Sequence, residues 1–191
     1  LYPNPASVLA FIENHDTDRF LGEGDNLPML KQASTLLLTT RRIPQLYYGT
    51  EIMMNGVKSK SDGYVRKDFP GGWADDKETA LTTEGRSKIQ NDCYNFYKTI
   101  LNWRKGNDVI AKGSMTQFMV QNGVYAYARQ HEGKTVFVML NGTDSATAVP
   151  LKFYKEILKD AKQGKDILSG RTIAFGEELK MGARESLVIE L

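Results

Sequence analysis

Asn14, His15 and Asp16 place an amide, an imidazole and a carboxylate in succession directly after a short apolar run. Arg19 follows three positions later. In parallel α/β sheets and barrels, ligands bind at the carboxyl ends of strands, so this position favours a functional role. Asp16 could hold its charge against a developing cation while His15 donates a hydrogen bond to a substrate hydroxyl. The alternative is that Asp16 and Asp18 cap the turn and pair with Arg19.

A second polar cluster lies in residues 53–82, which are rich in Gly, Asp and Lys and form an unusually long loop. Asp62 and Arg66 are four residues apart. A carboxylate accepts and a guanidinium donates in fixed geometry, so the pair could bind adjacent hydroxyls of one sugar. It could equally be a surface ion pair of little energetic value. Trp73 could stack on a sugar, but for Trp73 and Phe69 we expect anchoring of the loop in the core.

The elements that carry these clusters alternate between strand and helix. Residues 8–12 and 43–48 are short apolar runs, typical of strands buried on both faces of a parallel sheet. Between them, apolar residues recur at helical spacing from 27 to 38, and a second helix is predicted at about 84–105. The order βαβα predicts a parallel α/β architecture for residues 1–107.

Local signals set the ends of these helices. Asp25 or Asn26 is a candidate N-cap of the first helix, with Pro28 in its first turn, and Gly106 is placed to end the second helix. Cys93 is predicted to be a buried apolar residue. One side of the second helix is expected to comprise Ile89, Cys93, Phe96, Tyr97, Ile100, Leu101 and Trp103.

From residue 108 to 191, short β-branched and aromatic runs alternate with turn signals, which predicts a second domain, an antiparallel β-sandwich. Asn122-Gly123 and Glu132-Gly133 mark turns, the first a strong hairpin signal. Residues 153–161 could form a helical turn or an extended edge. Candidate strands lie at 116–120, 124–129, 135–140, 146–151, 171–175 and 186–191. Alternating Tyr125 and Tyr127 are expected to fill the core, although they could form a sugar-binding platform.

Composition narrows the functional classes. The 191 residues are 41% hydrophobic and 25% charged, with a formal charge of +2, so neither nucleic acid nor a membrane is expected as a partner. A single cysteine cannot close an internal disulfide. His15 and His131 fall in different predicted domains, and no metal or other cofactor is predicted. Glycine-rich phosphate loops and a serine-hydrolase elbow are also missing from the sequence.

Three segments together resemble the α-amylase family of glycoside hydrolases. Residues 11–19 (FIENHDTDR) resemble the family's fourth signature segment, at the end of the seventh barrel strand. Residues 43–51 (IPQLYYGTE) are similar to the eighth strand, and 62–73 (DGYVRKDFPGGW) resemble the following loop in the neopullulanase and cyclomaltodextrinase branch. The direct resemblance covers about residues 8–105. It implies that residues 1–107 are the last two βα units of a (β/α)8 (TIM) barrel, and 108–191 the sandwich that follows it.

The resemblance also implies a retaining hydrolysis of α-glucan oligosaccharides with α-1,4 and in some members α-1,6 bonds, drawn from starch, pullulan or cyclodextrins. Asp16 matches the acidic residue that stabilises the distorted, cationic sugar, and His15 the histidine that binds the same ring. Asp62 and Arg66 match a pair that contacts a sugar further toward the non-reducing end. By the same match, Asn14 and Arg19 are supporting residues.

The family's nucleophile and acid lie on its fourth and fifth strands, and neither is among these 191 residues. We therefore expect that further residues precede Leu1 and that the parent enzyme is active, in the cytoplasm or the periplasm. Residues 1–191 alone are expected to be inactive. Barrel faces left exposed would favour self-association. One alternative is a non-catalytic carbohydrate-binding or interaction module that binds sugar through Tyr125, Tyr127 or Tyr154. Another is an inactive relative of the amylases.

Overall fold

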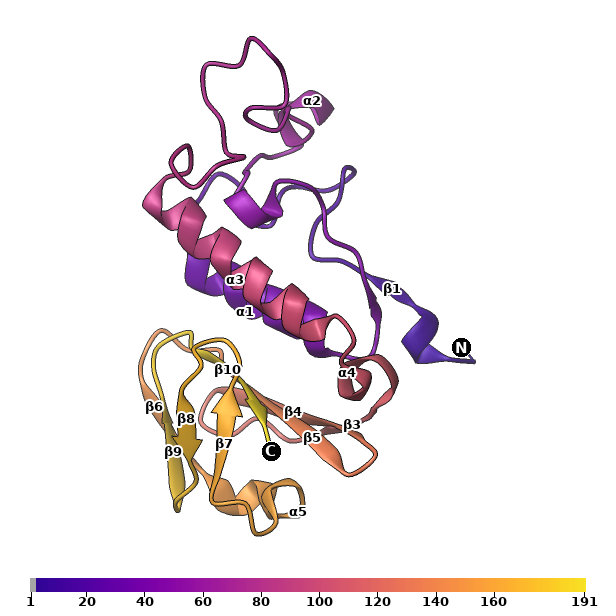
Figure 1. The fold of residues 1–191 in the computed structure, drawn as a ribbon, viewed down its shortest axis with the longest axis vertical. Coiled ribbons are helices and arrows are strands. Elements are labelled where there is room, and N and C mark those ends of the chain that lie inside the picture. The colour runs from indigo at the N-terminus through magenta and orange to yellow at the C-terminus, as the bar shows by residue number, and fades with distance from the viewer. Residues whose placement is uncertain (1–2) are drawn as a thin grey trace.

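The computed structural model describes residues 3–191. Helices and a long loop occupy one end of the molecule, and antiparallel strands occupy the other (Figure 1). The α-helices are α1 (Leu27–Thr39), α2 (Asp62–Val65), α3 (Lys88–Arg104), α4 (Asp108–Lys112) and α5 (Lys155–Leu158), with 3₁₀ turns at Pro5–Ser7, Thr50–Ile52 and Leu151–Tyr154. The strands are β1 (Leu9–Ala10), β2 (Ile43–Pro44), β3 (Ser114–Gln117), β4 (Val124–His131), β5 (Lys134–Asn141), β6 (Thr147–Pro150), β7 (Gln163–Asp166), β8 (Thr172–Ala174), β9 (Glu178–Met181) and β10 (Ser186–Glu190).

The first two strands pair in parallel, as the sequence predicts, with Leu9 opposite Ile43. Each strand is only two residues long, much shorter than the apolar runs that contain them. The prediction that both faces are buried is wrong, because Leu9 and Ile43 are each 51% exposed and Phe11 is also exposed. No third strand pairs with this two-stranded sheet among the described residues, so nothing there covers these side chains.

The two long helices pack against each other and bury one face each. Asn26 caps α1 by accepting a hydrogen bond from the amide of Met29, and Ser87 caps α3 in a capping box with Gln90. Cys93 is fully buried, as predicted, and burial raises the pKa of its thiol to about 12. The predicted apolar side of α3 is only partly correct, because its residues Ile89 and Leu101 are exposed.

The remaining strands form antiparallel sheets. Six strands lie in the order β3-β4-β5-β10-β7-β8, and β6 pairs with β9. Both predicted glycine turns are present: Asn122, Gly123, Glu132 and Gly133 all have the positive φ of a type I′ turn. Residues 153–161 take the helical alternative. The sequence analysis missed α2, α4, β7 and β9.

A close-packed core joins the two antiparallel sheets. The side chains in it come from β4, β5 and β10 on one side and from β6 and β9 on the other. Tyr154 is fully buried in this core, against Phe137 and Phe118. It therefore presents no face to solvent for a sugar.

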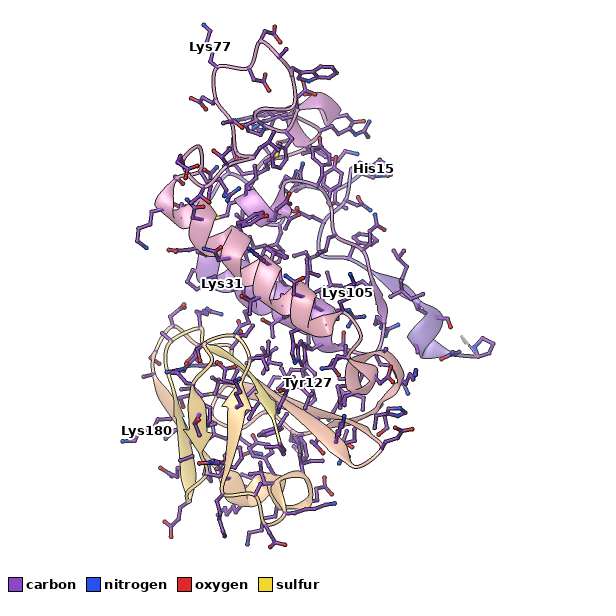
Figure 2. All side chains as sticks on the ribbon, viewed as in Figure 1. His15, Lys31, Lys77, Lys105, Tyr127 and Lys180 are labelled. Atoms are coloured by element: carbon purple, nitrogen blue, oxygen red, sulfur yellow. The ribbon has the colours of Figure 1, made fainter. Side chains whose placement is uncertain are left out.

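The opposite face of the six-stranded sheet packs against the helices. Tyr127 is fully buried at this junction, its hydroxyl hydrogen-bonded to Thr39, and lies between the helices and the strands (Figure 2). Arg129 is also fully buried and donates to the carbonyls of Thr39, Ile110, Gly113 and Ser114 at 2.8–3.2 Å. Burial lowers the pKa of this guanidinium. The junction is thus fixed by directed hydrogen bonds as well as by apolar contact.

Candidate functional site

The loop after β1 presents His15 and Asp16 to solvent. The side-chain oxygen of Asn14 accepts the amide of Asp16 at 2.8 Å, and the amide of Asn14 donates to the hydroxyl of Thr17 at 3.0 Å. These bonds form a tight turn whose outer side carries the two candidate side chains. Nε2 of His15 lies 3.2 Å from Oδ2 of Asp16. The turn thus orients an imidazole and a carboxylate side by side, in the half of the molecule away from the antiparallel strands (Figure 2).

A buried ion pair lies beneath this turn. Arg19 is almost completely buried, and its Nη1 lies 3.3 Å from Oε1 of Glu13, which is also buried. The same guanidinium donates to the carbonyls of Val65 at 3.0 Å and Tyr48 at 2.7 Å. Arg19 therefore joins three segments: the turn after β1, the chain after β2 and the end of α2. It does not pair with Asp16 or Asp18, so the alternative in which it does is wrong.

Glu13 is the residue of this site that the sequence analysis did not single out. Its carboxylate accepts the amide of Phe20 at 2.5 Å and the hydroxyl of Thr50. The sequence did carry a signal for it, because Glu13 directly follows the apolar run of residues 8–12. A carboxylate at the end of a buried run is itself buried and needs hydrogen-bonding partners nearby. With Arg19, Glu13 holds the turn from below.

The single turn of α2 brings the second polar cluster to the first. Ser61 caps the turn by accepting the amide of Tyr64 at 3.1 Å. The four-residue spacing then places Nη2 of Arg66 3.1 Å from Oδ2 of Asp62. The same Nη2 lies 3.2 Å from Oδ1 of Asp16, and Nε donates to the carbonyl of His15 at 3.0 Å. Arg66 is therefore the centre of a cluster that contains all four candidate ligand-binding residues.

The cluster is polar, exposed and balanced in charge. Lys58 lies 3.3 Å from the second oxygen of Asp62, so two cations face the carboxylates of Asp16 and Asp62. Exposed ion pairs add little to the free energy of folding, so a need for stability does not explain why these charged side chains lie together. Carboxylates that accept and a guanidinium that donates from fixed positions match the hydroxyls of a polyol.

The aromatic candidates for sugar binding differ in their exposure to solvent. Trp73 is 64% exposed, so the prediction that it anchors the loop is wrong, whereas Phe69 is half-buried. Tyr127 and Tyr154 are buried and Tyr125 is half-buried, so a tyrosine platform on the strands is not formed. The described part of the chain has no group of three or more His, Cys, Asp or Glu side chains placed to hold a metal ion. Of the helices within residues 3–191, none is long and apolar enough to span a bilayer.

Comparison with known proteins places this geometry in context. Residues 115–190 match the family model described as the cyclo-malto-dextrinase C-terminal domain. A cyclomaltodextrin glucanotransferase of Thermoanaerobacterium thermosulfurigenes is 32% identical over 168 residues, which are 84% of this chain and 21% of that protein. The chain is related to the C-terminal part of α-amylase-family glycoside hydrolases. An α-amylase of Niallia circulans, another member by name, is 29% identical over 85% of this chain and 29% of its own length.

The fold agrees with the sequence relationship. The α-amylase of Geobacillus thermoleovorans, in a complex with acarbose, superposes with a TM-score of 0.76 over 99% of this chain and 40% of that one, at 24% identity. The chain has the small α/β part and the mostly antiparallel sheets of the C-terminal region of that α-amylase. It spans only 21% and 29% of the two curated α-amylase-family relatives.

Proposed function

We propose that this chain supplies one side of the active site of a retaining hydrolase of α-glucans. The observation that carries the proposal is the position of Arg66, which bonds Asp62 and the His15-Asp16 turn together beside two parallel strands. In this proposal Asp16 stabilises the distorted, cationic sugar and His15 binds the same ring. Asp62 and Arg66 bind the hydroxyls of a sugar further toward the non-reducing end.

The proposal extends to the architecture. Residues 1–107 would form the last two βα units of a (β/α)8 barrel, and 108–191 the β-sandwich that follows it. Support comes from the exposed faces of Leu9, Phe11 and Ile43, which further barrel strands would cover, and from the partial coverage of the relatives. The nucleophile and the proton donor would come from those further strands, so residues 1–191 alone would not catalyse hydrolysis.

We infer that the parent enzyme belongs to the neopullulanase and cyclomaltodextrinase branch. The match of residues 115–190 to the cyclo-malto-dextrinase C-terminal domain supports this inference. The substrates would be oligosaccharides from starch, pullulan or cyclodextrins. A sugar-binding module built on the strand region is not favoured, because Tyr127 and Tyr154 are buried and Tyr125 is half-buried. Asn14 and Arg19 would act by holding the turn in place rather than by touching the sugar.

Asp16→Asn in the full-length protein tests the proposal. We expect kcat on maltooligosaccharides to fall by about 10⁴-fold, since removal of one member of a catalytic unit typically costs this much. The Kd for acarbose should change much less, because asparagine keeps the shape and one acceptor oxygen. Asp75→Asn is the matched control: Asp75 is exposed and makes no hydrogen bond or ion pair within residues 3–191. An Asp16→Asn variant that retains a tenth or more of the turnover would contradict the proposal.

A further inference from the structure

The loop that follows Arg66 carries an exposed indole that the cluster at Asp16 does not use. Two aromatic side chains lie four residues apart in this loop, and the structure treats them differently. Phe69 is half-buried, whereas Trp73 is 64% exposed. The exposed indole leaves a large, flat apolar face available to a ligand.

Several contacts give this loop a defined shape. The amide of Ala80 donates to the carbonyl of Pro70 at 2.9 Å, so the two ends of the loop meet. Between these ends, the carboxylate of Asp76 accepts the amides of Gly71 at 2.8 Å and Trp73 at 3.1 Å. Compact loops of this kind, whose ends are close together, are often functional. The backbone of Trp73 is thus held by a side chain within its own loop.

The turn before Trp73 requires glycine. Gly71 has φ +88°, a value that side-chain-bearing residues rarely adopt, and a Cβ there would lie 2.2 Å from Oγ1 of Thr79. The loop therefore depends on one glycine and one aspartate at defined positions to present an indole outward. A loop that served only as a connection would not need this construction.

The position of the loop relates Trp73 to the cluster. The loop and α2 lie together at the end of the molecule away from the strands (Figure 1). The hydroxyl of Tyr48 donates a hydrogen bond to the carbonyl of Lys67 at 2.6 Å. This bond fixes the start of the loop beside Arg66. Arg66 and Trp73 are seven positions apart, so the two lie within about 25 Å even if the chain is fully extended. A linear oligosaccharide of several units bridges such a span.

We propose that the indole of Trp73 is a stacking platform for a glucose ring of an α-glucan, beyond the ring bound by Asp62 and Arg66. The flat apolar face of a pyranose fits an indole, and the neighbouring carboxylate of Asp68 is an exposed acceptor for sugar hydroxyls. Trp73 thereby sets a preference for longer chains. This inference rests on the proposed function, because it needs an α-glucan at the cluster.

The test measures the binding of maltotriose and maltoheptaose by calorimetry in the full-length protein. An Asp16→Asn background prevents turnover, and Trp73→Ala, Trp73→Phe, Leu81→Ala and Arg66→Ala are compared within it. We expect Trp73→Ala to raise the Kd for maltoheptaose about tenfold and to leave maltotriose unchanged. Trp73→Phe should recover part of the loss. Leu81, also 64% exposed in the same region, should give no effect when changed to alanine.

Two outcomes would overturn the inference. If Arg66→Ala weakens both ligands and Trp73→Ala weakens neither, Trp73 is not a sugar platform, although the proposed function stands. If neither substitution weakens either ligand, both proposals fail. A Trp73 indole that is shielded from acrylamide in the sugar-free full-length protein would also overturn the inference, because another part of the chain would then cover it.

Discussion

The two groups of strands in this chain bury their apolar side chains to very different degrees. In β4, β5 and β10, the inward side chains are completely enclosed between the second sheet on one face and the helices on the other. In β1 and β2, Leu9 and Ile43 remain half-exposed. The antiparallel strands therefore have both faces covered within this chain, while the parallel pair, which carries the candidate turn, has faces that the described residues do not cover. The proposed barrel would account for this difference, because its further strands would cover the parallel pair.

Two fully buried arginines repeat this difference. Arg129, at the junction of the helices and strands, donates to four backbone carbonyls. Arg19, beneath the functional turn, pairs with Glu13 and donates to two carbonyls, and its Nη2 has no hydrogen-bond partner in the described part of the chain. Every nitrogen of the Arg129 guanidinium has a hydrogen-bond partner, whereas the unpartnered buried nitrogen of Arg19 weakens the hydrogen-bonding around it.

The largest effect on stability is expected from Arg129→Ala. The substitution leaves buried carbonyls at Thr39, Ile110 and Gly113 without this donor and opens a cavity at the junction. Each unsatisfied buried group costs about 1–3 kcal/mol, so the free energy of unfolding should fall by about 3 kcal/mol or more. Urea denaturation of the full-length protein measures the change. Arg41→Ala, at an exposed position, is the control and should cost less than about 0.5 kcal/mol.

A loss below about 1 kcal/mol for Arg129→Ala would break the comparison, because the junction would then not depend on these hydrogen bonds. The strand region and the helices would in that case be held together by apolar contact alone.

A smaller effect is expected from Ile43→Ala, which tests the exposed face of the parallel pair. If further barrel strands cover this face in the full-length protein, the substitution should cost about 2 kcal/mol or more, as for a buried isoleucine. Met119→Ala provides the control, since Met119 is 84% exposed in the strand region and should be nearly neutral. Equal costs for the two variants, measured by urea denaturation, would show that the face at Ile43 stays exposed.

Local signals predicted much of the fold. The helix start at Asn26 and the turns at Asn122 and Glu132 depend on residues within a few positions of each other, so the sequence alone contains their cause. Strand β7 could not be predicted in this way. Its inward positions are Gly164 and Asp166, and the buried carboxylate of Asp166 is compensated by the amides of Ser169 and Val188, which donate to it. No apolar alternation marks such a strand.

The site was predicted in part. The resemblance to the α-amylase family implied that His15, Asp16, Asp62 and Arg66 belong together, and the structure brings them into one cluster. The buried Glu13–Arg19 pair and the exposure of Trp73 depend on contacts between segments far apart in sequence. For Arg19 the sequence left open a surface pair with Asp16 and Asp18, and for Trp73 residue type favoured a core position. Tertiary packing excludes the first and reverses the second.

The most direct test of the account is a crystal structure of the full-length protein with bound acarbose, the compound present in the complex of the related α-amylase. The account predicts sugar rings within hydrogen-bonding distance of Asp16, Asp62 and Arg66. Acarbose bound only to the strand region, with no sugar at this cluster, would contradict it.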